Sequence, residues 1–193
     1  MTISLRICIH RVENENKIQL LIMPPPDKNH TDADLSDLRA AMRRWATGVS
    51  IVSTKLDESI HGMTVNSFTS ISIDPALITV ALEKTTRTHE MIMQSRIFGV
   101  TILTGEQQDI SDRFAGRLPD DHDRFAGLPT EVLVTGAPFI LGGLAYIDCR
   151  LNTMMDGGSN NLIVGEVVAT KTAGEIEGAD PLLYFAREYH RLK

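Results

Sequence analysis

The sequence predicts a mainly β fold, an antiparallel β-barrel with a few flanking helices. Runs with strand character outnumber helical ones and follow one another in hairpin order with short connections. The segment "DGGS" at 156–159 separates two long strand-like runs and is a strong hairpin signal. No G-x-G-x-x-G follows a strand-like run and no Walker loop is present, which argues against a doubly wound nucleotide-binding fold.

The composition is that of an ordinary globular chain. Its 193 residues are enough to enclose a substantial core. The net charge of −6 argues against a nucleic-acid partner, which would require a basic face. No apolar run approaches the roughly eighteen residues of a membrane helix, and the N-terminus lacks the pattern of a signal peptide. We therefore expect a cytoplasmic protein with no membrane partner.

Residues 1–30 differ from the rest of the chain. They end close to Pro24-Pro25-Pro26, a stiff extended spacer. We expect an N-terminal arm or extension that could be partly disordered, followed by one domain over 31–193. That domain begins with an amphipathic helix over 31–48, because cap candidates precede it and a glycine ends it. The apolar stripe of this helix consists of Leu35, Leu38, Met42 and Trp45.

The next part of the chain has mainly strand character. The run at 49–56 ends in a turn at 57–59, and "DP" ends the run at 60–73. An almost purely aliphatic run at 76–82 predicts a buried core strand. The elements predicted next are a short helix at 89–95 and a strand at 97–103.

The second half combines one helix with long strands. Ile110 and Phe114 lie four positions apart, which favours a helix over 105–116. A polar loop then leads to a strand-like run at 130–140. The remaining predicted elements are long strands at 144–155 and 161–173 and a short aromatic and basic C-terminus at 181–192.

Residues for nucleophilic or metal chemistry are poorly represented. The six histidines have no H-x-H or H-E-x-x-H spacing, so we expect no metal site. No serine lies in a G-x-S-x-G motif, which argues against a hydrolase triad. Cys8 and Cys149 lack a C-x-x-C spacing and are expected to be inert core thiols. We therefore predict no catalytic side chain.

The most concentrated polar signal lies in two neighbouring segments, "TVNSFTS" at 64–70 and "EKTTRTH" at 83–89. On a continuous strand, alternate residues from Thr64 to Ser70 would share one face. The second segment combines hydroxyls with a lysine and an arginine, which suits a phosphate. Two interpretations remain open at this point: a nucleotide-type site, or a polar strand followed by a capped helix start.

Several ordered motifs resemble the flavin reductase-like family. They are "RRWATGVSIVST", "HGMTVNSFTSISIDPALITVAL", "TTRTHEMI", "FGVTIL", "QQDISDRFAG", "LGGLAYIDCRL", "VGEVV" and "PLLYFAREYHRL". The resemblance runs from about residue 35 to 192, and the serine-rich strand before S-x-D-P is its most specific part. It implies an antiparallel FMN-binding split barrel in a short-chain NAD(P)H:flavin oxidoreductase, often the reductase component of a two-component flavin monooxygenase.

The resemblance also implies where a flavin, FMN or FAD, would bind. The implied flavin contacts are Thr64, Val65, Asn66, Ser67, Ala81, Leu82, Glu83, Thr86, Arg87, Thr88, Phe114 and Ala115. Thr86, Arg87 and Thr88 would lie nearest the phosphate, because an arginine, hydroxyls and a helix start suit a dianion. A homodimer with the flavin near the subunit interface is implied as well.

One position departs from the family pattern. Many members carry G-D-H just before V-G-E-V, and the histidine is associated with binding the nicotinamide nucleotide. Here the stretch reads "GSNNLIVGEV", so the implied NAD(P)H contacts are Gly158, Ser159 and Asn160, with Asn160 at the histidine position. Asparagine can donate and accept hydrogen bonds, but it cannot titrate or stack as imidazole does.

The predicted activity is that of a flavin reductase. Hydride would pass from C4 of NAD(P)H to N5 of the flavin, and the reduced flavin would be supplied to a separate monooxygenase. Two alternatives stay open. One is an oxidoreductase that holds its flavin tightly and reduces a ferric chelate, a corrinoid or an organic substrate. The other is a flavin-binding protein without turnover, which asparagine at position 160 would favour.

Overall fold

The computed structural model describes residues 35–116, 122–172 and 180–192. The chain divides into two compact units, Met1–Ala40 and Ala41–Lys193. The predicted extension at 1–30 lies outside the described residues. The features that follow belong to the second unit, apart from the first residues of helix α1.

The helix predicted over 31–48 is shorter in the structure. Helix α1 spans Leu35–Met42, and Thr47–Gly48 forms the short strand β1. The glycine therefore does not end the helix, because the chain has already left it at Met42 and pairs with a C-terminal strand. Three side chains of the predicted apolar stripe are exposed, namely Leu38, Met42 and Trp45.

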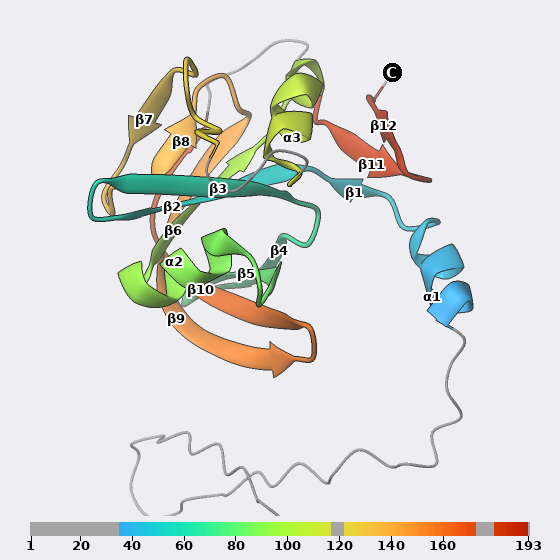
Figure 1. Ribbon diagram of the computed structural model, residues 1–193, viewed down its shortest axis with the longest axis horizontal. Coiled ribbons are helices and arrows are strands. Elements are labelled where there is room, and N and C mark those ends of the chain that lie inside the picture. The colour runs from blue at the N-terminus through green and yellow to red at the C-terminus, as the bar shows by residue number, and fades with distance from the viewer. Residues whose placement is uncertain (1–34, 117–121, 173–179, 193) are drawn as a thin grey trace, which may run out of the picture. The chain divides into compact units, whose positions relative to one another are not determined.

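Seven strands form one antiparallel sheet, which confirms the predicted mainly β architecture (Figure 1). The strand order is β3-β2-β6-β9-β10-β5-β4. The predicted hairpin at 156–159 is confirmed as the tip of β9–β10, the longest strand pair of the sheet. The strands are β2 (Ser50–Leu56), β3 (Ser59–Val65), β4 (Thr69–Ile73), β5 (Ala76–Glu83), β6 (Ile97–Ile102), β9 (Ala145–Gly157) and β10 (Asn160–Thr172).

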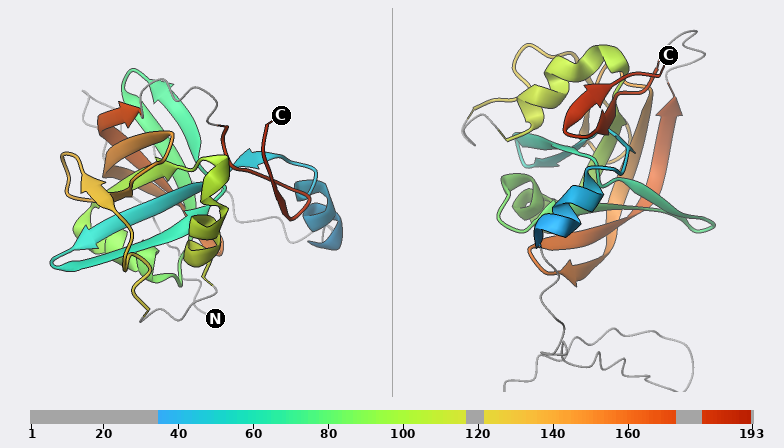
Figure 2. Two further views of the ribbon diagram at one scale, coloured as in Figure 1. Left: turned by 90° about the horizontal axis from the view of Figure 1, so that it is seen from above. Right: turned by 90° about the vertical axis from the view of Figure 1, so that its right-hand side faces the viewer.

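The main core lies on the inner side of this sheet. The strand predicted at 76–82 is confirmed as β5, but only its alternate residues are buried, so it is half-buried and not buried on both faces. Helix α2 (Arg87–Ser95) adds the fully buried Ile92 to the same core, so this helix packs over the curled sheet (Figure 2). The buried members of the core are Val52, Val65, Ile78, Val80, Leu82, Ile92, Phe98, Val100, Cys149, Leu151 and Ile163.

The strand predicted over 60–73 is interrupted, and the predicted shared face from Thr64 to Ser70 is wrong. β3 ends at Val65 and β4 begins at Thr69. Between them, the Ser67 hydroxyl donates to the carbonyl of Ala81 at 2.9 Å and accepts from its N–H at 3.1 Å. One side chain thus satisfies both backbone groups that a paired strand would otherwise bond. The break follows from this long-range contact.

A second, smaller core lies beneath the last helix. The predicted helix at 105–116 consists of a 3₁₀ turn, η1 (Gly105–Gln107), and helix α3 (Gln108–Phe114). Phe114 packs edge-on against Phe125 with ring centroids 4.9 Å apart. The remaining strands are β7 (Thr130–Val132) and β8 (Pro138–Ile140), which divide the predicted run at 130–140, and β11 (Leu183–Phe185) and β12 (Glu188–His190). Within the described ranges, no helix is long and apolar enough to cross a membrane.

Candidate active site

A cavity of about 410 Å³ adjoins the N-terminal turn of α2; we call it the α2 pocket. Residues of β3, of the β5–α2 connection and of the end of α3 meet there. The lining residues are His61, Met63, Thr64, Glu83, Thr85, Thr86, Arg87, Thr88, Phe114, Ala115, Gly116 and Arg124. The structure therefore brings together most of the predicted flavin contacts from three separate parts of the sequence.

The first turn of α2 forms one end of the pocket. Thr86 is the N-cap: it has an extended backbone, donates to the carbonyl of Glu83 at 2.8 Å and accepts from the amide of His89 at 3.4 Å. The buried Thr88 hydroxyl lies 2.8 Å from Nδ1 of His61, which holds the turn against β3. The dipole of a helix N-terminus favours a negative group, and the guanidinium of Arg87 carries a full positive charge. This end of the pocket suits a phosphate.

A second arginine of the pocket, Arg124, was missed by the sequence reasoning. Its side chain is 5% exposed, and Nη1 donates to the carbonyl of Gly62 at 3.1 Å. A sequence signal for it exists, because the pentapeptide D-R-F-A-G occurs at both 112–116 and 123–127. Each copy buries its phenylalanine against the other, and each ends in a glycine with positive φ, which a residue with a side chain rarely adopts.

A cavity of about 290 Å³ adjoins the α2 pocket and shares Thr64 and Ala115 with it; we call it the C-terminal pocket. The Thr64 hydroxyl donates to the carbonyl of Ser111 at 2.6 Å, and the Ser111 hydroxyl lies 2.8 Å from that of Tyr189. These contacts hold β3, α3 and β12 around the cavity. Its lining consists of Val49, Thr64, Val65, Asn66, Ala115, Tyr184, Arg187 and Tyr189. The last three were missed, although the aromatic and basic C-terminus was the signal for them.

Three of the predicted flavin contacts line neither cavity. Ser67 and Ala81 are bonded to each other, as described above. The Leu82 side chain is completely buried in the main core. Leu82 is also paired with Asn161 of β10, so the structure does not bring it to the predicted flavin contact.

The predicted NAD(P)H contacts form the tip of the β9–β10 hairpin. Asn160 is paired with Glu83, a lining residue of the α2 pocket, and the amide of Lys84 donates to the carbonyl of Ser159 at 3.1 Å. The tip therefore lies directly beside the pocket. Gly158 has a φ of 87° at the turn, a conformation that glycine adopts without strain.

The described residues offer binding groups rather than an activated nucleophile. Burial, with a smaller effect of the Asp148 carboxylate, raises the pKa of the Cys149 thiol to about 12, so the thiolate is not formed near neutral pH. Cys149 is fully buried, as predicted, whereas Cys8 lies outside the described residues. Within those residues, no group of three or more His, Cys, Asp or Glu side chains is placed to hold a metal ion. The arrangement offers hydrogen-bonding groups along two adjoining cavities and a positively charged side chain at one of them.

Known proteins are similar to this chain in both sequence and fold. The Flavin reductase like domain family matches residues 42–193. The chain is 35% identical to the NADH-dependent flavin reductase StyB of Pseudomonas fluorescens, over 82% of this chain and 91% of that protein. It is 31% identical to HsaB of Mycobacterium tuberculosis, the reductase subunit of a flavin-dependent monooxygenase, over 81% of each. The solved structure of the Streptomyces globisporus NADH:FAD oxidoreductase SgcE6 with NAD and FAD fragments aligns with a TM-score of 0.75 and 27% identity, covering 83% of this chain and 93% of that chain.

Proposed function

The chain belongs to the flavin reductase-like family, and from this premise we propose how its own residues serve the reduction of FMN or FAD by NAD(P)H. The protein is a flavin oxidoreductase of the kind that supplies reduced flavin to a monooxygenase. The observation that carries the proposal for the site is the α2 pocket, where distant predicted contacts line one cavity at a helix N-terminus. Its positive charge and its place at a helix N-terminus fit a flavin phosphate.

Different residues of the two pockets would bind different parts of the flavin. Thr86, Arg87 and Thr88 would hold the phosphate, and the segment from Thr64 to Asn66, between the pockets, would border the ring. When bound, the flavin supplies the redox chemistry by accepting the hydride of the reduced nicotinamide. The chain then needs to orient the ring, exclude water and leave one face open. That requirement agrees with a site rich in hydrogen-bond donors and poor in general acids and bases.

The hairpin tip is proposed to meet the nicotinamide dinucleotide. Gly158, Ser159 and Asn160 lie beside Glu83 at the edge of the α2 pocket, so a molecule resting on the tip would reach a ligand in that pocket. The Ser159 hydroxyl donates to Oδ1 of Asn160 at 2.9 Å, which leaves the amide nitrogen to contact the dinucleotide.

Steady-state turnover tests the function. Oxidation of NADH and NADPH by the purified protein is measured from the loss of their absorbance with added FMN, with FAD and with neither. Turnover that requires added flavin is expected. Turnover without added flavin would favour the tightly bound alternative with another acceptor. No oxidation with either flavin would contradict the reductase proposal and favour a flavin-binding protein without turnover.

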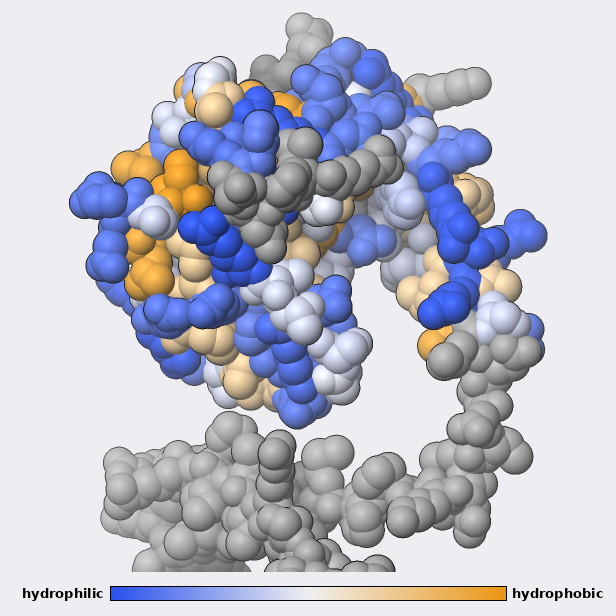
Figure 3. Space-filling model, in the orientation of Figure 1, coloured by the Kyte–Doolittle hydropathy of each residue, from blue (hydrophilic) through white to orange (hydrophobic). Residues whose placement is uncertain are grey.

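We also propose a homodimer, which the surface of edge strand β4 supports. Ile71 and Ile73 of β4 are 50% and 86% exposed, and an unpaired edge with apolar side chains favours association. Ile73→Lys should convert dimer to monomer in sedimentation experiments. The matched control is Val132→Lys on β7, another exposed apolar position (57%). Figure 3 shows hydrophilic residues over much of the visible face and a group of hydrophobic residues at its left, so exposed apolar side chains are not confined to β4. Dissociation by the control alone would contradict the choice of β4.

A separate monooxygenase partner is proposed for the reduced flavin. The similarity to reductase components such as HsaB supports it. An oxygenase encoded next to this chain should oxidise its substrate only when the reductase, NADH and flavin are all present. A cytoplasmic location is also proposed, which the absence of a disulfide framework in a chain with two cysteines supports.

A further inference from the structure

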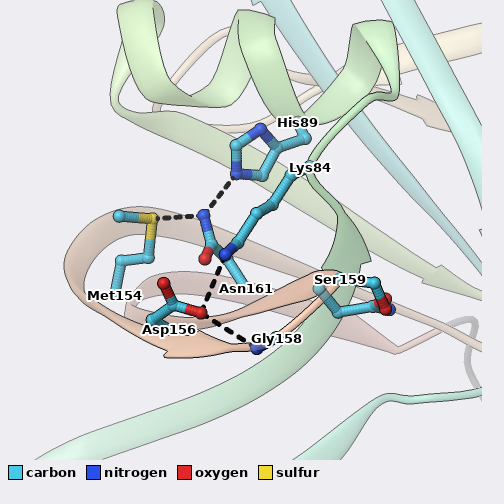
Figure 4. A network of polar contacts seen from close by, with 8 residues as sticks. Lys84, His89, Met154, Asp156, Gly158, Ser159 and Asn161 are labelled. Atoms are coloured by element: carbon cyan, nitrogen blue, oxygen red, sulfur yellow. Dashed lines mark hydrogen bonds and ion pairs between the residues drawn. The ribbon is translucent and has the colours of Figure 1, made fainter.

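Besides the backbone pairing of Asn160 with Glu83, two side-chain contacts fasten the tip of the β9–β10 hairpin, one to the β5–α2 connection and one to the first turn of α2 (Figure 4). One is an ion pair between Lys84 Nζ and Asp156 Oδ1 at 2.8 Å. Asp156 Oδ1 also accepts from the amide of Gly158 at 2.9 Å, which shapes the turn itself. The side chains of Lys84 and Asp156 are 34% and 75% exposed. Such a pair is screened by solvent and contributes little to holding the tip.

The other contact is buried and lies one residue beyond the predicted NAD(P)H contacts. Nδ2 of Asn161 lies 2.8 Å from Nε2 of His89 and donates to Sδ of Met154 at 2.9 Å. Asn161 and His89 are only 6% and 8% exposed. An amide nitrogen carries two hydrogens, so this geometry uses one for the unprotonated imidazole nitrogen and one for the thioether. Breaking a buried hydrogen bond leaves a desolvated polar group without a partner.

His89 belongs to the same helical turn that borders the α2 pocket. Thr86 and Thr88 of that turn line the pocket, and its N-cap accepts from the amide of His89. The turn therefore borders the pocket through Thr86 and Thr88 and contacts the hairpin through His89. A shift of the tip relative to this turn would change the distance between the two proposed ligand sites.

We propose that His89 and Asn161 are positioning residues for the nicotinamide dinucleotide: their buried contact holds the 158–160 tip at a fixed place beside the α2 pocket. Neither side chain needs to touch a ligand. Asn161 acts through Asn160 and Ser159, its neighbours on the tip, and His89 anchors it to the helix. The inference rests on the proposed function, since the tip matters for turnover only if the dinucleotide binds there.

The test is a double-mutant cycle that preserves volume. His89→Phe, Asn161→Leu and the double variant remove one or both polar partners while keeping the site filled. The control is Asp156→Asn, which removes the exposed ion pair from the same hairpin. For each protein, KM and kcat for NADH are measured at saturating flavin, the Kd of FMN by fluorescence quenching, and the melting temperature by circular dichroism.

If the two residues position the dinucleotide, KM for NADH should change while kcat and the Kd of FMN stay nearly constant. Asn161→Leu should raise KM for NADH about tenfold, equivalent to about 1.4 kcal/mol, with kcat and the Kd of FMN changed less than about twofold. The double variant should be no worse than the worse single variant, because one contact is lost in all three. Asp156→Asn should keep KM within about twofold of the wild type.

Several outcomes overturn the inference. An unchanged KM in folded Asn161→Leu would do so, as would additive effects of the two substitutions. Parallel losses in KM, kcat and FMN affinity would show general damage to the fold instead of positioning. If Asn161→Leu does not fold, the same constants from His89→Phe decide the question. Absence of NADH oxidation by the wild type would overturn the proposed function itself, whereas a wild-type KM in the variants overturns only the positioning role.

Discussion

Arg87→Gln should weaken the binding of FMN much more than that of riboflavin, which lacks the phosphate. Arg87 lies in the first turn of α2 and lines the α2 pocket, but its side chain is exposed. A hydrogen bond to a charged group contributes about 1.5–3 kcal/mol, and exposure places this one at the lower end. A loss of about 1.4 kcal/mol corresponds to a tenfold higher Kd for FMN.

The assay compares two ligands and two variants. Kd values for FMN and riboflavin are measured from flavin fluorescence at low and at physiological salt. The matched control is Arg96→Gln at the C-terminal cap of the same helix, because it also removes one positive charge from a chain of net charge −6. We expect less than a twofold change in the control, and a smaller effect of Arg87→Gln at higher salt, where the exposed charges are screened.

Two results would refute the phosphate assignment. Equal losses for FMN and riboflavin would show that Arg87 acts on the ring or on the fold and not on the phosphate. An equal loss in Arg96→Gln would show that net charge, and not the position of the guanidinium, determines affinity.

Three further predictions concern neighbouring residues. Asn160→His should lower KM for NADH with flavin affinity unchanged; an unchanged KM would contradict the placement of the dinucleotide on the hairpin tip. Ser67→Ala should lower the free energy of unfolding in urea by about 2 kcal/mol, because both backbone groups of Ala81 lose their partner, whereas exposed Ser70→Ala should change it by less than about 0.5 kcal/mol. Burial and, less strongly, Lys84 lower the pKa of His89 from 6.5, so below about pH 6.5 the unfolded chain binds the proton first. The free energy of unfolding should therefore fall as the pH drops from about 6.5 to the pKa of the folded state, and His89→Gln should lack this contribution.

The strands could be predicted where neighbouring residues in the sequence determine where a strand begins and ends. The β9–β10 hairpin follows from the turn chemistry of "DGGS", and β5 follows from its aliphatic run. The interruption between β3 and β4 could not be predicted, because its cause is the bond of Ser67 to Ala81, fourteen positions away. A polar residue at alternating spacing looks the same whether its hydroxyl points to solvent or bonds a neighbouring strand.

The site was predictable to a similar degree. The hydroxyls and the arginine of the segment 83–89 predicted a phosphate site or a capped helix start. In the structure, Thr86 is the N-cap of α2. Arg124 comes from a different part of the chain and reaches the α2 pocket only because Phe125 packs against Phe114. The repeated D-R-F-A-G is a signal for this packing, but the spacing of its two copies does not show that their phenylalanines meet. Tyr189 likewise reaches the C-terminal pocket through the Ser111 contact.

The two hydroxyl-rich segments of the sequence have different roles in the structure. The hydroxyls of Thr64 and Ser67 donate to carbonyls of Ser111 and Ala81 and thereby hold α3 and β5 in place. A hydroxyl has one hydrogen, so neither can donate to a ligand without breaking these bonds. Donation to a flavin at the end of β3 would then fall to backbone groups and to Asn66, which is exposed at the C-terminal pocket. The Thr86 hydroxyl likewise donates to a carbonyl, that of Glu83, so recognition of the negative charge would belong to the guanidinium of Arg87 and the N-terminus of α2. The ring and the phosphate would thus be bound by separate parts of the chain, which is why a phosphate-specific loss on changing Arg87 distinguishes the two.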